Sequence, residues 1–305
     1  MASTATCAAS SLLPRPPDSP ALEETLEPAT VANVPLLIAA PRQINKGTPI
    51  IIMYHGFGPP NSPELLAKAL PPIHGALTVY PSLPLMGERI PAGGVEELVR
   101  RQTEDYKGQL LYPSILGAAR ELPGIIESLS KTYGLSKASP VILFGFSAGG
   151  AAALLSLTES SVRPRAVLVV NSPLSIAQAV DGYERQSKRV YSWTEKAREA
   201  SAHYDIEKNA MRIAQLNPKT AFLILQSEHD AGFSAPAAQA AATTLKNAAS
   251  RLGAEPDVSA VILPGVDHYV LDGAEPTTIK LNGTPVKLMI INWIERHAFA
   301  ESSSP

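Results

Sequence analysis

One serine of this chain lies where its hydroxyl could act as a nucleophile. Ser147 is the centre of the sequence Gly-Phe-Ser-Ala-Gly at 145–149, between an apolar run at 140–144 and a run of small residues at 150–155. This order predicts a strand, a sharp turn and a helix, with the serine at the tip of the turn. Glycines two residues before and after the serine suit so tight a turn, because larger side chains would collide with neighbouring backbone. The alternative interpretation is a glycine-rich turn whose serine caps a helix.

A serine hydroxyl needs a base to accept its proton, and the base needs an acid that orients it. The chain supplies candidates for both roles, each just after an expected strand. Asp230 follows the run 221–225, and His268 follows the run 258–263. Loops that leave the carboxyl ends of parallel strands build the site of an open α/β sheet. The sequence therefore predicts a catalytic triad of Ser147, His268 and Asp230.

Other acids and histidines compete for these roles. Asp230 is favoured because the turn has reversed toward the site by the time the chain reaches it. Glu228 in the same loop is the alternative acid, whereas Asp267 is adjacent to the histidine and could not easily fold back onto its imidazole. The competing histidines lie in expected helices or loops, or before the last strand, and are His74, His203, His229 and His297.

Acyl transfer also requires donors that stabilise negative charge on the carbonyl oxygen. The backbone N–H of Ala148, directly after the serine, is the first expected donor. The second is expected from the loop 55–58, which reads His-Gly-Phe-Gly and follows the strand 49–54. Phe57 is the predicted donor in that loop. A phosphate-binding loop is the alternative, but neither Gly-x-Gly-x-x-Gly nor a Lys-Ser/Thr ending is present.

Strands and helices alternate along the chain, which predicts right-handed crossovers and a mostly parallel sheet flanked by helices. The apolar run 34–38 is expected at the sheet edge, because Pro35 cannot donate into a central ladder. Pro123 is expected to kink or break its helix. The further strands expected are 49–54, 77–80, 140–144, 165–170, 220–225 and 258–263, and the helices are 63–70, 114–133, 236–252 and 286–299.

The domain organisation follows from changes in periodicity and composition. Residues 1–30 are rich in Ala, Ser, Thr and Pro and are expected to form a disordered or loosely attached leader. They lack the basic start and apolar core of a secretory signal, and their cluster of Glu argues against a transit peptide. Residues 31–172 and 218–300 are expected to form an α/β core. The helical and more charged segment 173–217 predicts an inserted cap.

Composition limits the partners of the chain. It has 305 residues, 45% of them hydrophobic, and a formal net charge of −2, which gives no electrostatic case for nucleic acid or an anionic membrane surface. No run approaches the roughly 20 apolar residues of a spanning helix. Cys7 is the single cysteine, so an internal disulfide or a cysteine metal cluster is impossible. We expect a cytoplasmic protein with no cofactor and no metal.

These motifs resemble the α/β-hydrolase superfamily, and within it the prolyl-oligopeptidase and dienelactone-hydrolase-like esterases. The resemblance implies an acyl-enzyme on Ser147, with His268 as general base and then acid and Asp230 orienting it. This chain lacks a β-propeller, and its segment 87–112 is longer than a minimal hydrolase needs and could fold over the site. The motifs that carry the resemblance are the loop 55–58, the Gly-Glu-Arg turn 87–89, the serine turn 145–149, the acid loop 228–230 and the histidine loop 265–268.

The expected function is hydrolysis of a carboxylic ester. A small or medium acyl ester held between the cap and the sheet is the expected substrate. A peptidase or amidase, an acyltransferase and a non-catalytic binding protein of the same fold are the alternatives. Acyl length and oligomeric state are not set by the sequence. A pocket between the cap and the sheet is expected because the segment 173–217 contains four large aromatic side chains, Tyr183, Tyr191, Trp193 and Tyr204.

Overall fold

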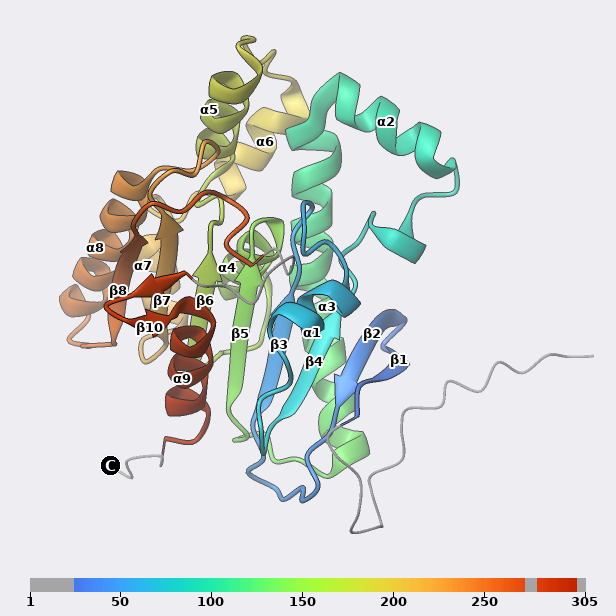
Figure 1. Ribbon diagram of the computed structural model, residues 1–305, viewed down its shortest axis with the longest axis vertical. Helices are drawn as coiled ribbons and strands as arrows, with labels where there is room; N and C mark the ends of the chain where they lie inside the picture. The colour runs from blue at the N-terminus through green and yellow to red at the C-terminus, as the bar shows by residue number, and fades with distance from the viewer. Residues whose placement is uncertain (1–24, 272–278, 301–305) are drawn as a thin grey trace, which may run out of the picture.

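The computed structural model describes residues 25–271 and 279–300. The long strands in that part of the chain are β1 (Glu27–Val31), β2 (Val34–Ala39), β3 (Ile50–Tyr54), β4 (Leu77–Pro81), β5 (Val141–Phe146), β6 (Ala166–Val170), β7 (Ala221–Ser227) and β8 (Val258–Leu263). They form one sheet in the order β1-β2-β4-β3-β5-β6-β7-β8 (Figure 1). The pairs β1–β2 and β2–β4 are antiparallel, and the pairs from β4 to β8 are parallel. The predicted mostly parallel sheet is confirmed.

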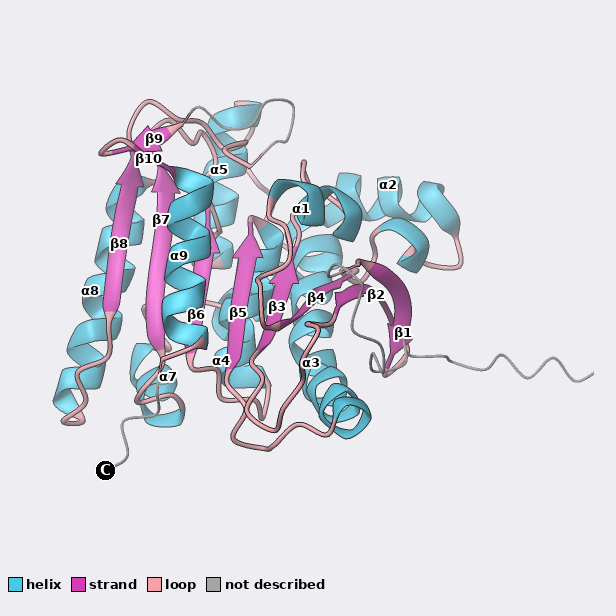
Figure 2. Ribbon diagram, turned by 60° about the horizontal axis from the view of Figure 1, so that its bottom comes forward, coloured by secondary structure: helices cyan, strands magenta, loops and turns pink. Residues whose placement is uncertain are grey.

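Helices cover both faces of this sheet (Figure 2). On one face lie α1 (Pro63–Ala69) and α9 (Val286–Ala298), the latter just after the short strands β9 (Lys280–Leu281) and β10 (Thr284–Pro285). On the other face lie α3 (Tyr112–Tyr133), α4 (Ala148–Glu159), α7 (Ala210–Leu216) and α8 (Ala235–Arg251). Each layer buries its own apolar cluster against the sheet. Cover on both faces explains why β3 is an unbroken apolar run.

A separate group of helices lies beyond the carboxyl ends of the strands (Figure 1). This group, called the cap below, consists of α2 (Gly94–Asp105), the π-helix η2 (Tyr106–Leu111), α5 (Ile176–Ser187) and α6 (Glu195–His203). The two segments of the cap are joined by the buried carboxylate of Asp105, which accepts hydrogen bonds from the hydroxyls of Tyr191 and Thr194. The same carboxylate accepts the Gly108 N–H at 2.8 Å, so it fixes the start of η2 as well.

The structure corrects the predicted boundaries of the cap in two places. Residues 94–111, part of the segment 87–112 that could fold over the site, form α2 and η2 and join the cap. Conversely α7, which falls inside the predicted cap 173–217, packs against α4 and α8 in the core. The reason is its buried apolar face, formed by Ala210, Ile213 and Ala214. The cap is therefore built from two segments of the chain instead of one.

The N-terminal region also differs from expectation. Strand β1 begins at Glu27, inside the segment 1–30 expected as a leader, and residues 1–24 lie outside the described part of the chain. The run 34–38 is not an edge strand, because β1 pairs with β2 and forms the edge itself. Pro35 is accommodated at the end of the ladder, since the pairing of β2 with β4 starts one residue later, at Leu36.

The remaining predicted elements are confirmed to within two residues at each end. Ser62 caps α1, because its hydroxyl accepts the Leu65 N–H at 3.2 Å. Helix α3 passes through Pro123 and continues to Tyr133 without the predicted break. None of the described helices combines the length and apolar character that a membrane crossing would need.

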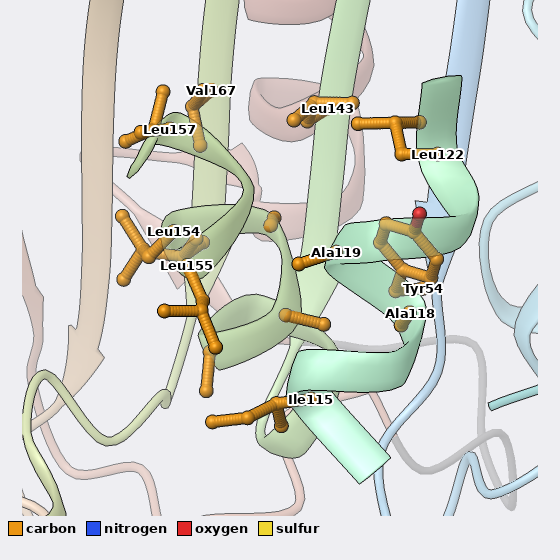
Figure 3. Packing of buried hydrophobic residues seen from close by; sticks show 14 of the residues in the cluster. Tyr54, Ile115, Ala118, Ala119, Leu122, Leu143, Leu154, Leu155, Leu157 and Val167 are labelled. Carbon is orange, nitrogen blue, oxygen red and sulfur yellow. The ribbon is translucent and has the colours of Figure 1, made fainter. Parts of the chain in front are cut away.

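Helices α3 and α4 pack closely against the centre of the sheet. Figure 3 shows Ala119 of α3 on the side of the helix that faces α4, and Ala118 beside Tyr54. Tyr54 at the end of β3 fills the space beside α3 and is 1% exposed. Its hydroxyl has no hydrogen-bond partner among the described residues. A buried hydroxyl without a partner is destabilising by roughly 1–3 kcal/mol.

Replacing Tyr54 with Phe should therefore raise the free energy of unfolding by about 1 kcal/mol, since the ring is kept and the unmet hydroxyl is removed. Urea unfolding followed by circular dichroism measures the change. Tyr80→Phe is the matched control, because the Tyr80 hydroxyl donates to the Leu70 carbonyl at 2.8 Å and its removal should lower stability. A loss of stability in the Tyr54 variant as large as in the control would contradict the expectation.

Candidate active site

Ser147 lies at the junction of β5 and α4 in a strained turn. Its backbone angles are φ 52° and ψ −121°, which residues other than glycine rarely adopt. A Cβ on Gly145 would overlap the backbone of Gly149. A Cβ on Gly149 would in turn overlap the carbonyl oxygens of Tyr54 and His55. The two glycines therefore let the serine turn lie directly against the end of β3.

The structure brings Ser147, His268 and Asp230 together in a hydrogen-bonded chain. Nδ1 of His268 is 2.8 Å from Oδ2 of Asp230. Nε2 of the same ring is 3.2 Å from the Ser147 hydroxyl. Because a carboxylate only accepts, Nδ1 carries the ring hydrogen, and the Nε2 lone pair faces the serine. This arrangement can accept a proton from the hydroxyl and stabilise the resulting imidazolium.

The Asp230 carboxylate is buried and fully engaged. Its Oδ1 accepts the N–H groups of Gly232 at 2.7 Å and Phe233 at 3.1 Å. Its Oδ2 accepts the Gln226 amide at 3.3 Å in addition to the imidazole. The side chain of Asp230 has no exposed surface. These donors hold the carboxylate in one orientation without neutralising it.

The two competing acids have other roles in the structure. Glu228 is exposed, and its Oε2 accepts the Gly265 N–H at 2.9 Å, so it closes the turn that leads to His268. Asp267 is also exposed and accepts the Tyr269 N–H at 2.9 Å within its own turn. Among the competing histidines, His203 contacts the Tyr112 hydroxyl and His297 the Trp293 carbonyl.

The two expected oxyanion donors lie at the same edge of the sheet. Ala148 is the first residue of α4, and Phe57 is in the loop after β3, which is the neighbour of β5. His55 fixes that loop, because its Nδ1 is 2.8 Å from the Gly56 carbonyl and its Nε2 accepts the Leu83 N–H at 3.1 Å. Burial lowers the pKa of His55 to about 4, outweighing the Gly56 hydrogen bond, which raises it. The ring is therefore neutral at pH 7.

Asn171 is a positioning residue that the sequence analysis does not identify. It lies at the end of β6, fully buried, with a left-handed φ of 46°. Its amide nitrogen donates to the His268 carbonyl at 2.8 Å and to the Ser227 hydroxyl at 2.9 Å. Its amide oxygen accepts the Ser227 N–H at 2.7 Å. Its place directly after the strand 165–170, at the edge where the site forms, is the available sequence signal.

Aromatic rings surround the imidazole of His268. Phe146, Phe233 and Tyr269 lie with ring centroids 5.4, 5.6 and 5.3 Å from it. The ring of Phe57 makes an edge contact with Tyr106 of the cap at 6.1 Å. The site is thus bordered by aromatic side chains of both core and cap. In the described ranges, no group of three His, Cys, Asp or Glu side chains is placed to hold a metal ion.

Comparisons with known proteins identify the fold. No family model matches the chain, and no curated protein matches it in sequence. TT1662 from Thermus thermophilus is similar in structure, with a TM-score of 0.63 and 18% identity over 92% of this chain and 100% of that one. Acylaminoacyl peptidase from Pyrococcus horikoshii gives 0.60 and 16% identity over 93% of this chain, which spans only 43% of that enzyme.

A third similar structure is a candidate dienelactone hydrolase from Klebsiella pneumoniae, with a TM-score of 0.54 and 14% identity over 90% of this chain and 98% of that one. Together with the sheet order and the flanking helices, these likenesses show that the chain has the α/β-hydrolase fold. Identities this low establish the architecture alone.

Replacing Asn171 with Asp should lower kcat by about 10-fold or more, because a carboxylate cannot donate to the His268 carbonyl and the histidine loop shifts. The measurement is kcat for a p-nitrophenyl ester, with KM expected to change little. Asn217→Asp is the matched control, since the Asn217 amide is also buried but donates to the Leu157 carbonyl at 3.0 Å, at the far end of α4 from Ser147. Equal losses in both variants would show only general destabilisation.

His55 should make the fold sensitive to mild acid. Its pKa is lower in the folded chain, so between pH 6.5 and about 4 the unfolded chain binds more protons. Stability should fall as pH decreases through that window, by up to about 3 kcal/mol from this group. Urea unfolding at pH 7, 5.5 and 4.5 measures the slope. The change of stability with pH should be smaller in His55→Gln. It should be unchanged in His203→Gln, because the His203 ring is exposed. An unchanged pH dependence in His55→Gln would exclude His55 as its source.

Proposed function

We propose that this chain is a serine hydrolase that cleaves carboxylic esters. The observation that supports the proposal is the hydrogen-bonded chain from Asp230 through His268 to Ser147, at 2.8 and 3.2 Å. The serine is held in a strained turn at the head of a helix, where its hydroxyl faces the base. A helix cap does not require that strain, nor an imidazole aligned on the hydroxyl.

Each residue of the site has a role in the proposed reaction. The Ser147 hydroxyl attacks the ester carbonyl while His268 Nε2 takes its proton, and Asp230 stabilises the imidazolium. The N–H groups of Ala148 and Phe57 stabilise the oxyanion of the tetrahedral intermediate. The imidazolium then protonates the leaving alkoxide, which leaves an acyl group on Ser147. Water, deprotonated by His268, releases the acid and restores the serine.

The choice of ester over amide rests on leaving-group chemistry. An alkoxide leaves more easily than an amine, so the same groups give ester cleavage with less assistance. The similar structures include both a peptidase and a candidate dienelactone hydrolase. The cap and the core meet where Tyr106 contacts Phe57 of the loop 55–58. This contact supports a substrate held between the cap and the core.

A fluorophosphonate probe should label the wild-type chain at Ser147 and should not label Ser147→Ala, as read by intact-mass spectrometry. Replacing Asp230 with Asn should lower kcat by about 10³–10⁴-fold, because the amide no longer fixes the working tautomer of His268. Glu228→Gln is the matched control and should keep kcat within about threefold, since the amide oxygen of glutamine can still accept the Gly265 N–H. Labelling of the alanine variant, or equal losses in both acid variants, would refute the proposed triad.

The substrate class is tested with the same protein. Hydrolysis of p-nitrophenyl esters of increasing acyl length should exceed hydrolysis of aminoacyl p-nitroanilides in kcat/KM. A preference for the anilides would indicate a peptidase, and product capture by an added alcohol would indicate an acyltransferase. Labelling without turnover of any of these would leave a binding protein with a reactive serine.

A further inference from the structure

The cap contains a buried lysine that the proposed reaction does not use. Lys107 lies in the π-helix η2 and is 6% exposed. Lysine is rarely buried unless its ammonium is paired, because removing the charge from water costs several kcal/mol. Its Nζ lies over the ring of Tyr106, 4.4 Å from the centroid, a cation–π contact that only partly offsets that cost.

The ammonium of Lys107 has no carboxylate partner in the described ranges 25–271 and 279–300, where no acidic oxygen lies within 4.0 Å of Nζ. The nearest acid in the sequence, Asp105, has its carboxylate bound by the hydroxyls of Tyr191 and Thr194 and by the Gly108 N–H. Burial lowers the pKa of Lys107 to about 8, so the side chain still carries its charge at pH 7.

Lys107 is connected to the loop 55–58 through the ring of Tyr106. The ring that its ammonium covers is Tyr106, and the edge contact of Tyr106 at 6.1 Å is with Phe57. The groove on the outside of the cap is lined by other cations, Arg100, Arg101 and Lys196, and not by Lys107. Lys107 is therefore separate from the outward-facing charges of the cap.

We propose that the ammonium of Lys107 binds a carboxylate of the substrate, so that the preferred esters carry a free acid group in addition to the ester that is cleaved. This inference rests on the proposed function and names its substrate class. A carboxylate suits the site better than a phosphate, because one ammonium matches one negative charge. The substrate carboxylate supplies the charged partner that the ammonium lacks among the described residues.

The segment that carries Lys107 is fixed in advance of binding. Asp105 holds the first turn of η2, and through Tyr191 and Thr194 it holds η2 to the segment that precedes α6. A π-helix is uncommon, and such turns are frequent at functional sites. The backbone of this segment therefore needs no rearrangement when the lysine binds a ligand, which favours affinity.

The test compares acidic esters with neutral esters of similar size. On the acyl side the pair is p-nitrophenyl hemiglutarate and p-nitrophenyl valerate; on the alcohol side it is 4-butyryloxybenzoate and phenyl butyrate. The wild-type chain should prefer the acidic member of at least one pair. Lys107→Met should lower kcat/KM for that member by about 10- to 100-fold, mainly through KM, and leave the neutral member within about threefold.

The matched control is Lys196→Met, which removes the same charge from an exposed position of the cap and should leave both ratios unchanged. Thermal melting of both variants verifies folding. If the Lys107→Met variant does not fold, the wild-type ratios decide alone. Equal rates for acidic and neutral members in both pairs, or equal losses for both members in the Lys107→Met variant, would overturn the assignment.

Direct binding separates this inference from the proposed function. Calorimetry with Ser147→Ala measures affinity for monomethyl glutarate against methyl valerate without turnover. Tighter binding of the acid, lost when Lys107→Met is added, supports the lysine site even if no ester is cleaved. If the proposed function is wrong, the chain shows no fluorophosphonate labelling and does not hydrolyse the neutral esters. Equal binding of the acidic and the neutral ester would refute the lysine site alone.

Discussion

The close approach of backbone between the start of α4 and the end of β3 is the constraint on which the site depends. Gly149 lies so near the carbonyl oxygens of Tyr54 and His55 that no side chain fits between them. This contact fixes the serine turn relative to the loop that follows β3. The two expected oxyanion donors lie on these two segments, so their separation is set by backbone packing and not by flexible side chains. Strain at Ser147, with φ 52°, is tolerated because the sheet and the helix on either side are fully buried.

Two buried polar side chains, His55 and Asn171, also fix the loops that follow the strands. Loops at strand ends leave backbone groups unpaired, and a side chain that satisfies them also fixes them. His55 fixes the loop 55–58 through its hydrogen bonds with Gly56 and Leu83. Asn171 fixes the loop that carries His268 by donating to the His268 carbonyl. With its carbonyl bound by Asn171 and its Nδ1 bound by Asp230, the histidine has Nε2 as the atom facing Ser147. The geometry thus directs proton transfer to a single ring nitrogen.

The sequence predicts those parts of the molecule that local pattern determines. Buried strands appear as apolar runs, and the loops after parallel strands meet at one edge, so Ser147, Asp230 and His268 could be placed near one another. Strand β1 could not be predicted, because Glu27-Pro28-Ala29-Thr30-Val31 has little strand character and is ordered by pairing with β2. Helix α2 could not be predicted either, because its apolar side chains Val95 and Val99 are exposed and form no buried stripe. The roles of Asn171 and Lys107 depend on contacts between distant segments, which no local pattern reports.

The contact between Phe57 and Tyr106 couples the donor loop to the cap. One ring belongs to the segment that is expected to supply an oxyanion donor, and the other lies under the Lys107 ammonium. A substrate carboxylate bound at the lysine would therefore lie near Tyr106, whose ring contacts Phe57, and this contact limits the distance from the carboxylate to the reacting carbonyl. Because η2 is anchored through Asp105 to the segment before α6, the backbone that carries Lys107 cannot move away to accommodate a longer spacing. Selectivity for spacing between acid and ester then follows from the same packing that assembles the cap.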